Sequence, residues 1–229
     1  MSSAGASNVA IAARPAKLRD RAYESFTTRL LAREIRAGQF ISQRELVEIT
    51  GLPLGAIREL IPRLEADGLI KTVPQRGMQV CTVDMQLVRN AYQFRLFMER
   101  EAALSFAVNA TGKQISDQRR AHESILKRAR KAVTPELMAE AQAVDYGLHD
   151  AIIDAVGNEI ISNAYRVNAI KIRLIRQEYT RLEPQLVVPV MTEHLGIIEA
   201  FEARDQARAA NAIEAHINRS RNRALGLTP

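Results

Sequence analysis

The chain has 229 residues, of which 47% are hydrophobic and 25% are charged, and its net charge is +6 at pH 7. This is the composition of a globular protein with one or two domains. A single cysteine, Cys81, excludes an internal disulfide and a cysteine-rich zinc finger. No apolar run is long enough to span a membrane and no secretory signal is visible, so we expect a cytoplasmic protein.

The positive charge is denser in the first part of the chain. Residues 1–83 contain 12 Lys and Arg against 8 Asp and Glu, whereas residues 84–229 contain 20 against 18. A basic segment indicates an anionic partner, either nucleic acid or a membrane surface. The alternative is an ordinary solvated basic face.

Residues 1–17 are small and polar and are expected to form a disordered tail, after which the sequence predicts three helices. Apolar residues recur at helical spacing over residues 18–35, and Gly38 ends this first helix. A capping box at residues 42–45 starts a short second helix. Pro53 suits the first turn of a third helix.

Residues 69–73 and 78–83 are rich in β-forming side chains and flank a turn, which predicts a hairpin. Three helices and a hairpin make a winged helix-turn-helix over residues 18–83. The remainder carries no strand signal and predicts an antiparallel bundle of six helices over residues 84–229, so the expected fold class is mainly α. The expected helices cover residues 84–109, 111–131, 134–156, 158–182, 190–203 and 205–225, with a loop bracketed by Pro184 and Pro189.

Four side chains in the second segment have the chemistry of a metal site. Asp145 and His149 are four residues apart and share one helix face. His194 and His216 lie on the last two expected helices, and antiparallel packing would turn both toward the first pair. One carboxylate with three imidazoles suits zinc, nickel or manganese. The alternative is a set of core or surface histidines without a ligand, and His122, among charged neighbours, is expected at the surface.

Another group of side chains is expected to belong to the apolar core rather than to a cofactor site. Cys81 is interpreted as an apolar filler and not as a nucleophile. The remaining members of the group are Tyr92, Phe94, Phe97 and Met98.

The first segment contains a series of short motifs: Gln-Arg-Glu-Leu at 43–46, Gly51, Ile-Arg-Glu-Leu at 57–60, Arg-Leu-Glu-Ala-Asp-Gly-Leu-Ile at 63–70 and Gln-Arg-Gly at 75–77. In this order they resemble the GntR family of bacterial transcription regulators. The second segment contains Arg95 with Glu99, Asp145 with His149 and Asn158, Glu193 with His194, Asp205, and His216. This set is similar to the helical ligand-sensing FCD domain of the FadR-like branch, of the metal-binding, VanR-like type.

The resemblance implies a homodimeric, sequence-specific DNA-binding regulator, in most such proteins a repressor, that reads a palindromic operator. It also implies that the four metal-capable side chains hold a divalent ion, zinc before nickel or manganese, whose coordination a small carboxylate effector completes. Arg95 is the expected effector-binding residue because a guanidinium matches a carboxylate, and Arg173 is a second candidate. The alternative for Arg95 is an ion pair with Glu99 on its own helix.

In a helix-turn-helix the first residues of the third helix meet base edges. Arg58 is expected to pair with the O6 and N7 atoms of a guanine. Arg44 is expected to approach the DNA backbone or an adjacent base, and Arg76 with Gly77 is expected to reach the minor groove from the wing tip. The other expected DNA-binding residues are Pro53, Leu54, Gly55 and Ala56.

The sequence departs from the family pattern at the start of the third helix. The family carries Ser-Arg or Thr-Arg where this chain has Pro53-Leu54, so Leu54 and Ala56 are expected to touch thymine methyl groups instead. A proline inside the helix, Pro62, is expected to bend it near Glu59. The alternatives are that Arg58 pairs with a glutamate on a solvated face, or that the winged helix binds protein.

Two competing functions use the same carboxylate and imidazoles. A metal held by them activates water in a hydrolytic enzyme, or serves as the signal itself in a metal sensor. The sequence shows no catalytic base, nucleophile motif or phosphate-binding loop, so no catalytic residue is predicted and the chain is not expected to be an enzyme.

Overall fold

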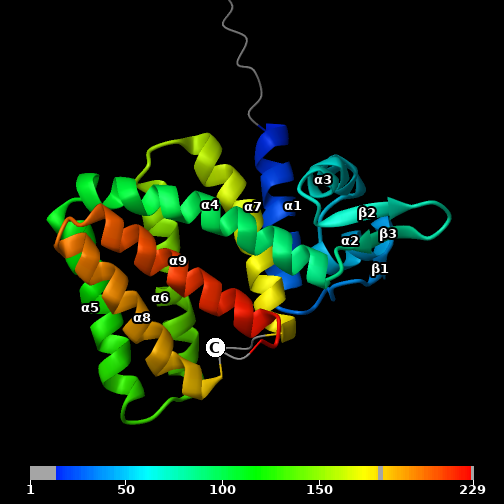
Figure 1. Ribbon diagram of the computed structural model, residues 1–229. Coiled ribbons are helices and arrows are strands. Elements are labelled where there is room, and N and C mark those ends of the chain that lie inside the picture. The colour runs from blue at the N-terminus through cyan, green and yellow to red at the C-terminus, as the bar shows by residue number, and fades with distance from the viewer. Residues whose placement is uncertain (1–13, 180–182, 228–229) are drawn as a thin grey trace, which may run out of the picture. The chain divides into compact units, whose positions relative to one another are not determined.

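The computed structural model describes residues 14–179 and 183–227 (Figure 1). The chain divides into two compact units, with the boundary between Thr82 and Val83. The expected tail falls mostly on residues 1–13, and the end of the helix expected over 158–182 falls on residues 180–182; both lie outside the described residues.

The first unit is a winged helix-turn-helix, as the sequence predicts. Its described elements are α1 (Arg14–Leu31), β1 (Phe40–Ile41), α2 (Gln43–Thr50), α3 (Leu54–Ala66), β2 (Ile70–Val73) and β3 (Gly77–Val80). The three strands form an antiparallel sheet in the order β1-β3-β2, with Phe40 opposite Gln79 and Ile41 opposite Met78. The sequence analysis predicted the β2–β3 hairpin but not β1, because two residues are too few to show an alternating pattern.

The first helix differs from its prediction at both ends. α1 already begins at Arg14, inside the segment that was expected to be tail. It ends at Leu31, because the chain turns through a left-handed conformation at Arg33 (φ 64°). Ile35 is fully buried although it lies outside the helix. Its apolar character therefore belongs to the core of the unit and not to a longer helix.

The helix-turn-helix has the expected capping chemistry with one shift. The hydroxyl of Ser42 accepts a hydrogen bond from the backbone N–H of Glu45 at 3.1 Å, and the Glu45 carboxylate accepts from the Ser42 N–H at 2.7 Å. Pro53 is the N-cap of α3 rather than part of its first turn. α3 continues through Pro62, since Leu60 and Leu64 on either side of it are fully buried.

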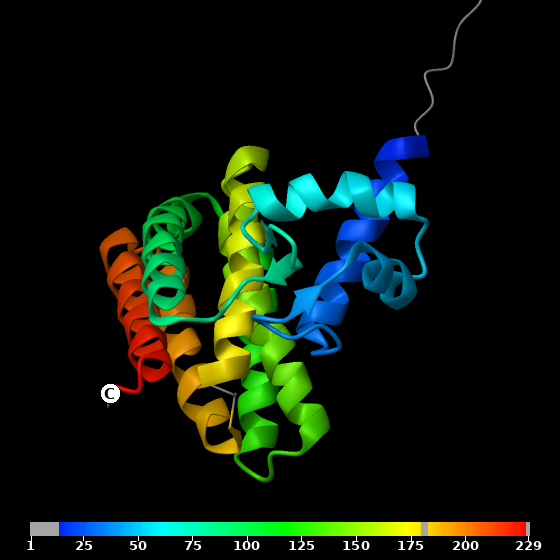
Figure 2. The same cartoon turned by 90° about the vertical axis from the view of Figure 1, so that its right-hand side faces the viewer.

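The second unit contains six helices in the described ranges, as predicted. They are α4 (Met85–Asn109), α5 (Gly112–Ala129), α6 (Pro135–Asp154), α7 (Glu159–Tyr179), α8 (Pro184–Glu202) and α9 (Gln206–Ala224). Both views place α9 alongside α4 (Figure 1, Figure 2), while α5 packs against α8 and α6. The helices of both described units include none that is long and apolar enough to cross a membrane.

One predicted loop of this unit is wrong. Residues 184–189 are the first turns of α8, with Pro184 at its first position and Pro189 inside it. A proline at the first position needs no N–H, so Pro184 starts the helix instead of breaking it. Val187 and Val190 flank Pro189 and are buried, and their packing holds the helical conformation.

The core of the second unit contains two apolar clusters and a separate set of buried polar side chains. One apolar cluster centres on Tyr92, Phe106 and Phe201, and a smaller one joins the facing ends of α5, α6 and α8. Phe97, which was expected in the core, is 67% exposed, because it lies on the outer face of α4. The buried polar and charged side chains of the described residues are Arg95, Glu99, His122, Asp145, His149, Asn168, Arg176, His194, His216 and Ser220.

Candidate metal centre and nucleic-acid interface

Four side chains from three helices of the second unit converge on one point. Asp145 and His149 come from α6, His194 from α8 and His216 from α9. One ligand atom from each lies within 4.8 Å of the others, and no side chain of the four is more than 2% exposed. The structure thus brings together the set that the sequence analysis singled out.

Two of the imidazoles are oriented by carboxylates outside the cluster. His149 Nδ1 lies 2.6 Å from Glu99 Oε2, and His216 Nδ1 lies 2.8 Å from Glu193 Oε2. An ionised carboxylate only accepts, so each Nδ1 carries the hydrogen and each Nε2 keeps a free lone pair. His149 Nε2 is buried and has no hydrogen-bond partner in the described part of the chain. The orphaned lone pair fits a bound cation.

His194 completes this inward-facing arrangement. Its Nε2 lies 3.3 Å from His216 Nε2 and 3.6 Å from Asp145 Oδ1. Burial lowers the pKa of His194 well below its usual value, and it lowers the pKa of His216 to about 4 against the opposing hydrogen bond to Glu193. Both imidazoles are therefore neutral at pH 7, which is the form that binds a metal.

Arg176 of α7 holds the carboxylate of Asp145, and no sequence motif predicts this role. Its guanidinium donates to Asp145 Oδ2 inside the core and leaves Oδ1 facing the imidazoles. Burial alone would raise the pKa of Asp145, but Arg176 and the surrounding histidines hold it well below its usual range. The carboxylate is therefore charged and available as a ligand.

His122 was expected at the surface, and this prediction is wrong. Its side chain is fully buried, and Nε2 lies 3.1 Å from His194 Nδ1. The prediction rests on its charged neighbours in sequence, but on a helix these side chains point in other directions. His122 shares a stripe with Ile115, Leu126 and Ala129, all buried, and that helical spacing was the signal in the sequence.

Arg95 forms the ion pair that was considered as its alternative role. Its Nε lies 2.5 Å from Glu99 Oε1, and both side chains are buried. Tyr165 donates a second hydrogen bond to Glu99 Oε1 at 2.6 Å. Burial alone would raise the pKa of Glu99, but Arg95 and His149 hold it well below its usual range. Arg95 therefore secures the carboxylate that orients His149.

A small pocket opens beside the cluster and contains the second predicted effector residue. Arg173 lies 4.4 Å above the ring of Tyr146, and its Nε is buried without a hydrogen-bond partner among the described residues. The lining residues are Arg95, Tyr146, His149, Asp150, Tyr165, Ala169, Ile172 and Arg173. Arg173, one of the convergent imidazoles and the Asp150 carboxylate therefore line the same small pocket.

In the first unit most of the predicted DNA-binding residues are exposed at the start of α3. Pro53, Gly55 and Arg58 are exposed, and Leu54 is 41% exposed. Arg58 makes no ion pair or hydrogen bond through its side chain within the described part of the chain. Ala56 is only 4% exposed and faces the core, so the expected contact of its methyl group with thymine is wrong.

The wing and the second helix supply three more exposed positions. Arg44 pairs with Glu48 at 3.2 Å, yet its side chain is 90% exposed. Arg76 is exposed at the β2–β3 turn, 5.6 Å from the centre of the Phe40 ring. Gly77 has φ 88°, and a Cβ there would meet the backbone oxygen of Ile41 at 3.2 Å. This glycine is needed for the close approach of β3 to β1.

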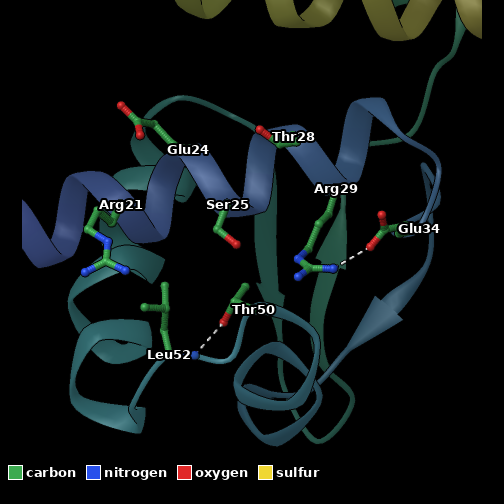
Figure 3. A pocket seen from close by; sticks show the side chains of 8 residues that line it. All are labelled: Arg21, Glu24, Ser25, Thr28, Arg29, Glu34, Thr50 and Leu52. Carbon is green, nitrogen blue, oxygen red and sulfur yellow. Dashed lines mark hydrogen bonds and ion pairs between the residues drawn. The ribbon is translucent and has the colours of Figure 1, made fainter.

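A polar pocket between α1 and the turn before α3 was not predicted (Figure 3). Arg29 pairs with Glu34 at 2.5 Å at one side of it, and the N–H of Leu52 faces the Thr50 hydroxyl at 3.4 Å. The remaining lining residues are Arg21, Glu24, Ser25 and Thr28. Both charge signs are present, so the pocket has no clear preference for an anion.

Two family models match the chain. Residues 18–80 match the model "Bacterial regulatory proteins, gntR family", and residues 90–219 match the FCD domain. The chain belongs to the GntR family of regulators that carry an FCD domain. Its relatives in this family are transcriptional regulators and not enzymes.

Individual relatives of this GntR regulator are distant. The uncharacterised HTH-type transcriptional regulator BphR of Paraburkholderia xenovorans LB400 is 26% identical over 181 residues, which are 76% of this chain and 70% of BphR. A GntR regulator from Rhodococcus sp. RHA1 has a similar structure, with a TM-score of 0.71 at 17% identity over 93% of this chain and all of the other. E. coli McbR/YncC gives 0.69 at 14% identity over 91% and 95%. These likenesses show a shared fold.

Proposed function

We propose that this GntR regulator is a homodimeric cytoplasmic repressor whose binding to a palindromic operator changes when a small carboxylate binds beside a metal in the helical unit. The proposed DNA-binding domain is residues 18–83, and the proposed sensing domain is residues 84–229. The observation that carries the proposal is the buried, unpartnered Nε2 of His149, which faces the two other imidazoles and the Asp145 carboxylate.

The donor set supports zinc as the ion. Three imidazoles and one carboxylate oxygen match the four ligands that zinc takes in proteins, and nickel and manganese accept the same groups. Asp145, His149, His194 and His216 would hold the ion, which when bound supplies a positive charge at which a carboxylate effector can complete the coordination.

Arg173 is the better of the two effector-binding candidates. Arg95 is already paired with Glu99, and taking it away would leave a buried carboxylate without its main counter-charge. Arg173 lines the same pocket and has a buried donor without a partner. A guanidinium with a free donor is suited to the carboxylate of a ligand.

The exposed residues of the first unit support base reading by α3. Arg58 is proposed to pair with a guanine, Arg44 to contact the backbone or an adjacent base, and Arg76 to enter the minor groove. Pro53, Leu54, Gly55 and Gly77 are proposed to lie against the DNA surface. Two copies related by a two-fold axis would read the two halves of a palindrome.

Selection of bound sequences from a random duplex pool at two salt concentrations tests the DNA-binding part. A palindromic consensus with strongly salt-dependent affinity is expected. Binding that is absent, or that shows no consensus, would contradict it.

Metal content and ligand response test the sensing part. After dialysis with zinc, the wild-type protein is expected to retain the ion and the His149→Gln variant to lose it. With zinc bound, acetate, benzoate and succinate are titrated while operator affinity is followed, and an active acid is expected to lose its effect in Arg173→Gln. A protein that responds to zinc alone, and to no acid, would instead be a metal sensor.

A further inference from the structure

His122 is a buried histidine beside the proposed metal centre, and it is not one of the four candidate ligands. It is fully buried in α5, on the far side of His194 from the four converging ligand atoms. Its Nδ1 lies 2.7 Å from the backbone oxygen of Gln118, one turn earlier on the same helix. Its Nε2 lies 3.1 Å from His194 Nδ1. Both ring nitrogens are therefore engaged in specific contacts.

The direction of these hydrogen bonds follows from what each atom can do. A backbone carbonyl oxygen only accepts, so the Nδ1 of His122 carries the hydrogen. The Nε2 of a neutral imidazole protonated on Nδ1 is an acceptor, and it faces the Nδ1 of His194. His194 must then donate from Nδ1, which leaves the lone pair on its Nε2 directed at Asp145 and His216.

We propose that His122 is a positioning residue of the metal centre, which fixes the tautomer and ring orientation of His194 through the chain Gln118 carbonyl, His122, His194. The proposal rests on the proposed function, because it gives the third imidazole the support that carboxylates give the other two. His149 has Glu99 and His216 has Glu193 on Nδ1, whereas His194 has the imidazole of His122. A hydrogen-bonding partner on the second nitrogen is a general feature of histidine ligands.

The choice of an imidazole instead of a carboxylate has an electrostatic reason. The carboxylates of Glu99 and Glu193 each have at least one arginine beside them, Arg95 and Arg219. A third buried carboxylate at the position of His122 would need its own counter-charge. A neutral acceptor orients His194 without adding a charge to the core.

Three variants of α5 separate positioning from mere packing. His122→Leu fills the buried position with an apolar side chain that cannot accept a hydrogen bond from His194. His122→Gln places an amide oxygen near the position of Nε2 and is expected to restore the hydrogen bond. Gln118→Ala is the matched control, because His122 bonds to the backbone oxygen of Gln118 and not to its side chain.

The first readout is metal binding by the full-length protein, with zinc affinity measured by competition against a chelator. Loss of a hydrogen-bonding partner of a ligand weakens metal affinity by roughly 10- to 100-fold, which is the loss expected for His122→Leu. His122→Gln is expected to bind zinc close to wild type, and Gln118→Ala to match wild type. Wild-type affinity in His122→Leu, or equal losses in His122→Leu and His122→Gln, would overturn the proposal.

The visible spectrum of the cobalt-loaded protein distinguishes a positioning residue from a ligand. The bands report the number and type of metal ligands, so His122→Leu is expected to keep the wild-type band pattern at saturating cobalt. A pattern that shows one ligand fewer would make His122 itself a ligand and overturn the proposal.

Nitrogen-15 NMR of the histidine rings in the metal-free protein is the second readout. Wild type is expected to show His194 protonated on Nδ1, and His122→Leu to lose that preference. If wild type binds no zinc or cobalt, the metal part of the proposed function fails, while this spectrum still decides the tautomer of His194. If His122→Leu does not fold, the spectrum of His122→Gln is used instead, and it is expected to show His194 protonated on Nδ1 as in wild type. A wild-type protein with His194 protonated on Nε2 overturns the proposal.

Discussion

The two units of the molecule place their polar chemistry in opposite locations. In the described part of the first unit, every buried residue is apolar, and the arginines proposed to read DNA are exposed. In the described part of the second unit, ten polar or charged side chains are buried among the helices, and they include all four candidate ligands. The first unit can therefore change its binding residues at little cost to its stability, whereas binding and stability in the second unit depend on the same atoms.

The largest effect is expected for a buried ion pair of the second unit. Arg176→Met removes the guanidinium that neutralises Asp145. Breaking such a pair leaves an uncompensated buried charge and costs about 3–5 kcal/mol. The free energy of unfolding of the metal-free protein, from urea denaturation, measures this loss. Saturating zinc is expected to recover part of it, because the ion supplies positive charge to the same carboxylate.

Arg166→Met on the same helix is the matched control. Arg166 also pairs with aspartates of α6, Asp150 at 3.1 Å and Asp154 at 2.5 Å, but its side chain is 43% exposed. Exposed pairs contribute about 0–1 kcal/mol, so this variant is expected to stay close to wild type. Equal losses of unfolding free energy in Arg176→Met and Arg166→Met would show that burial does not determine the cost of breaking these ion pairs.

Arg58 in the first unit is expected to show the opposite pattern, in which DNA binding is weakened and stability is unchanged. Arg58→Ala should weaken operator binding by about 1–3 kcal/mol per half-site and relax the preference for one base pair. The unfolding free energy should change by less than about 0.5 kcal/mol, because the side chain is exposed. Fluorescence anisotropy with the selected operator measures the first quantity.

Arg63→Ala provides the comparison for Arg58. Arg63 lies on the same helix but pairs with Asp20 at 2.8 Å and lies 4.0 Å from the Tyr23 ring centre. Its loss is expected to affect stability slightly and to leave the operator consensus unchanged. A change of consensus in Arg63→Ala and none in Arg58→Ala would place the DNA on another face of α3.

Acid should act on the second unit and spare the first. The pKa of His216 is about 4 in the folded chain and about 6.5 when unfolded. Between these values the unfolded chain holds more protons, so stability falls as pH decreases from about 6.5 to 4. Between pH 7 and 5 the metal-free protein is expected to lose about 2 kcal/mol from this group. Hydrogen exchange is expected to show the loss of protection in α8 and α9 but not in α3.

His216→Asn tests the assignment to this residue. The variant cannot take up the proton, so its stability should depend less on pH over the same range. A wild-type protein that is equally stable at pH 7 and pH 5 would rule out a buried neutral His216.

The sequence predicted best what local chemistry decides. The capping box at Ser42 and Glu45 and the i, i+4 pair of Asp145 and His149 depend on neighbours in sequence, and both have the expected local geometry. β1 was missed because its two residues gain strand character only from pairing with β3. Pro184 and Pro189 predict a loop between them, although packing of the neighbours of Pro189 keeps α8 helical.

The surroundings of the candidate ligands were less predictable. Arg176 lies 31 residues from Asp145, and Glu99 lies 50 residues from His149. Spacing on one helix says nothing about partners on another, so these roles emerge only when the helices are packed. His122 is the intermediate case, since the apolar stripe of its own helix contained the signal.

The smallest effect is expected where the first unit departs from its family. Leu54 is 41% exposed at the start of α3, at the position where the resemblance to the family predicts an arginine. Leu54→Arg adds one positive charge at the proposed interface, so the slope of log affinity against log salt should steepen by about 0.9 per protomer. Leu54→Gln has similar size without charge and should keep the wild-type slope. Stability should change by less than about 0.5 kcal/mol in both variants, because the site is at the surface. An unchanged slope in Leu54→Arg would mean that the start of α3 does not face the phosphates. DNA would then bind another surface of the first unit, and the contrast between an exposed DNA-binding surface and a buried sensing site would no longer rest on α3.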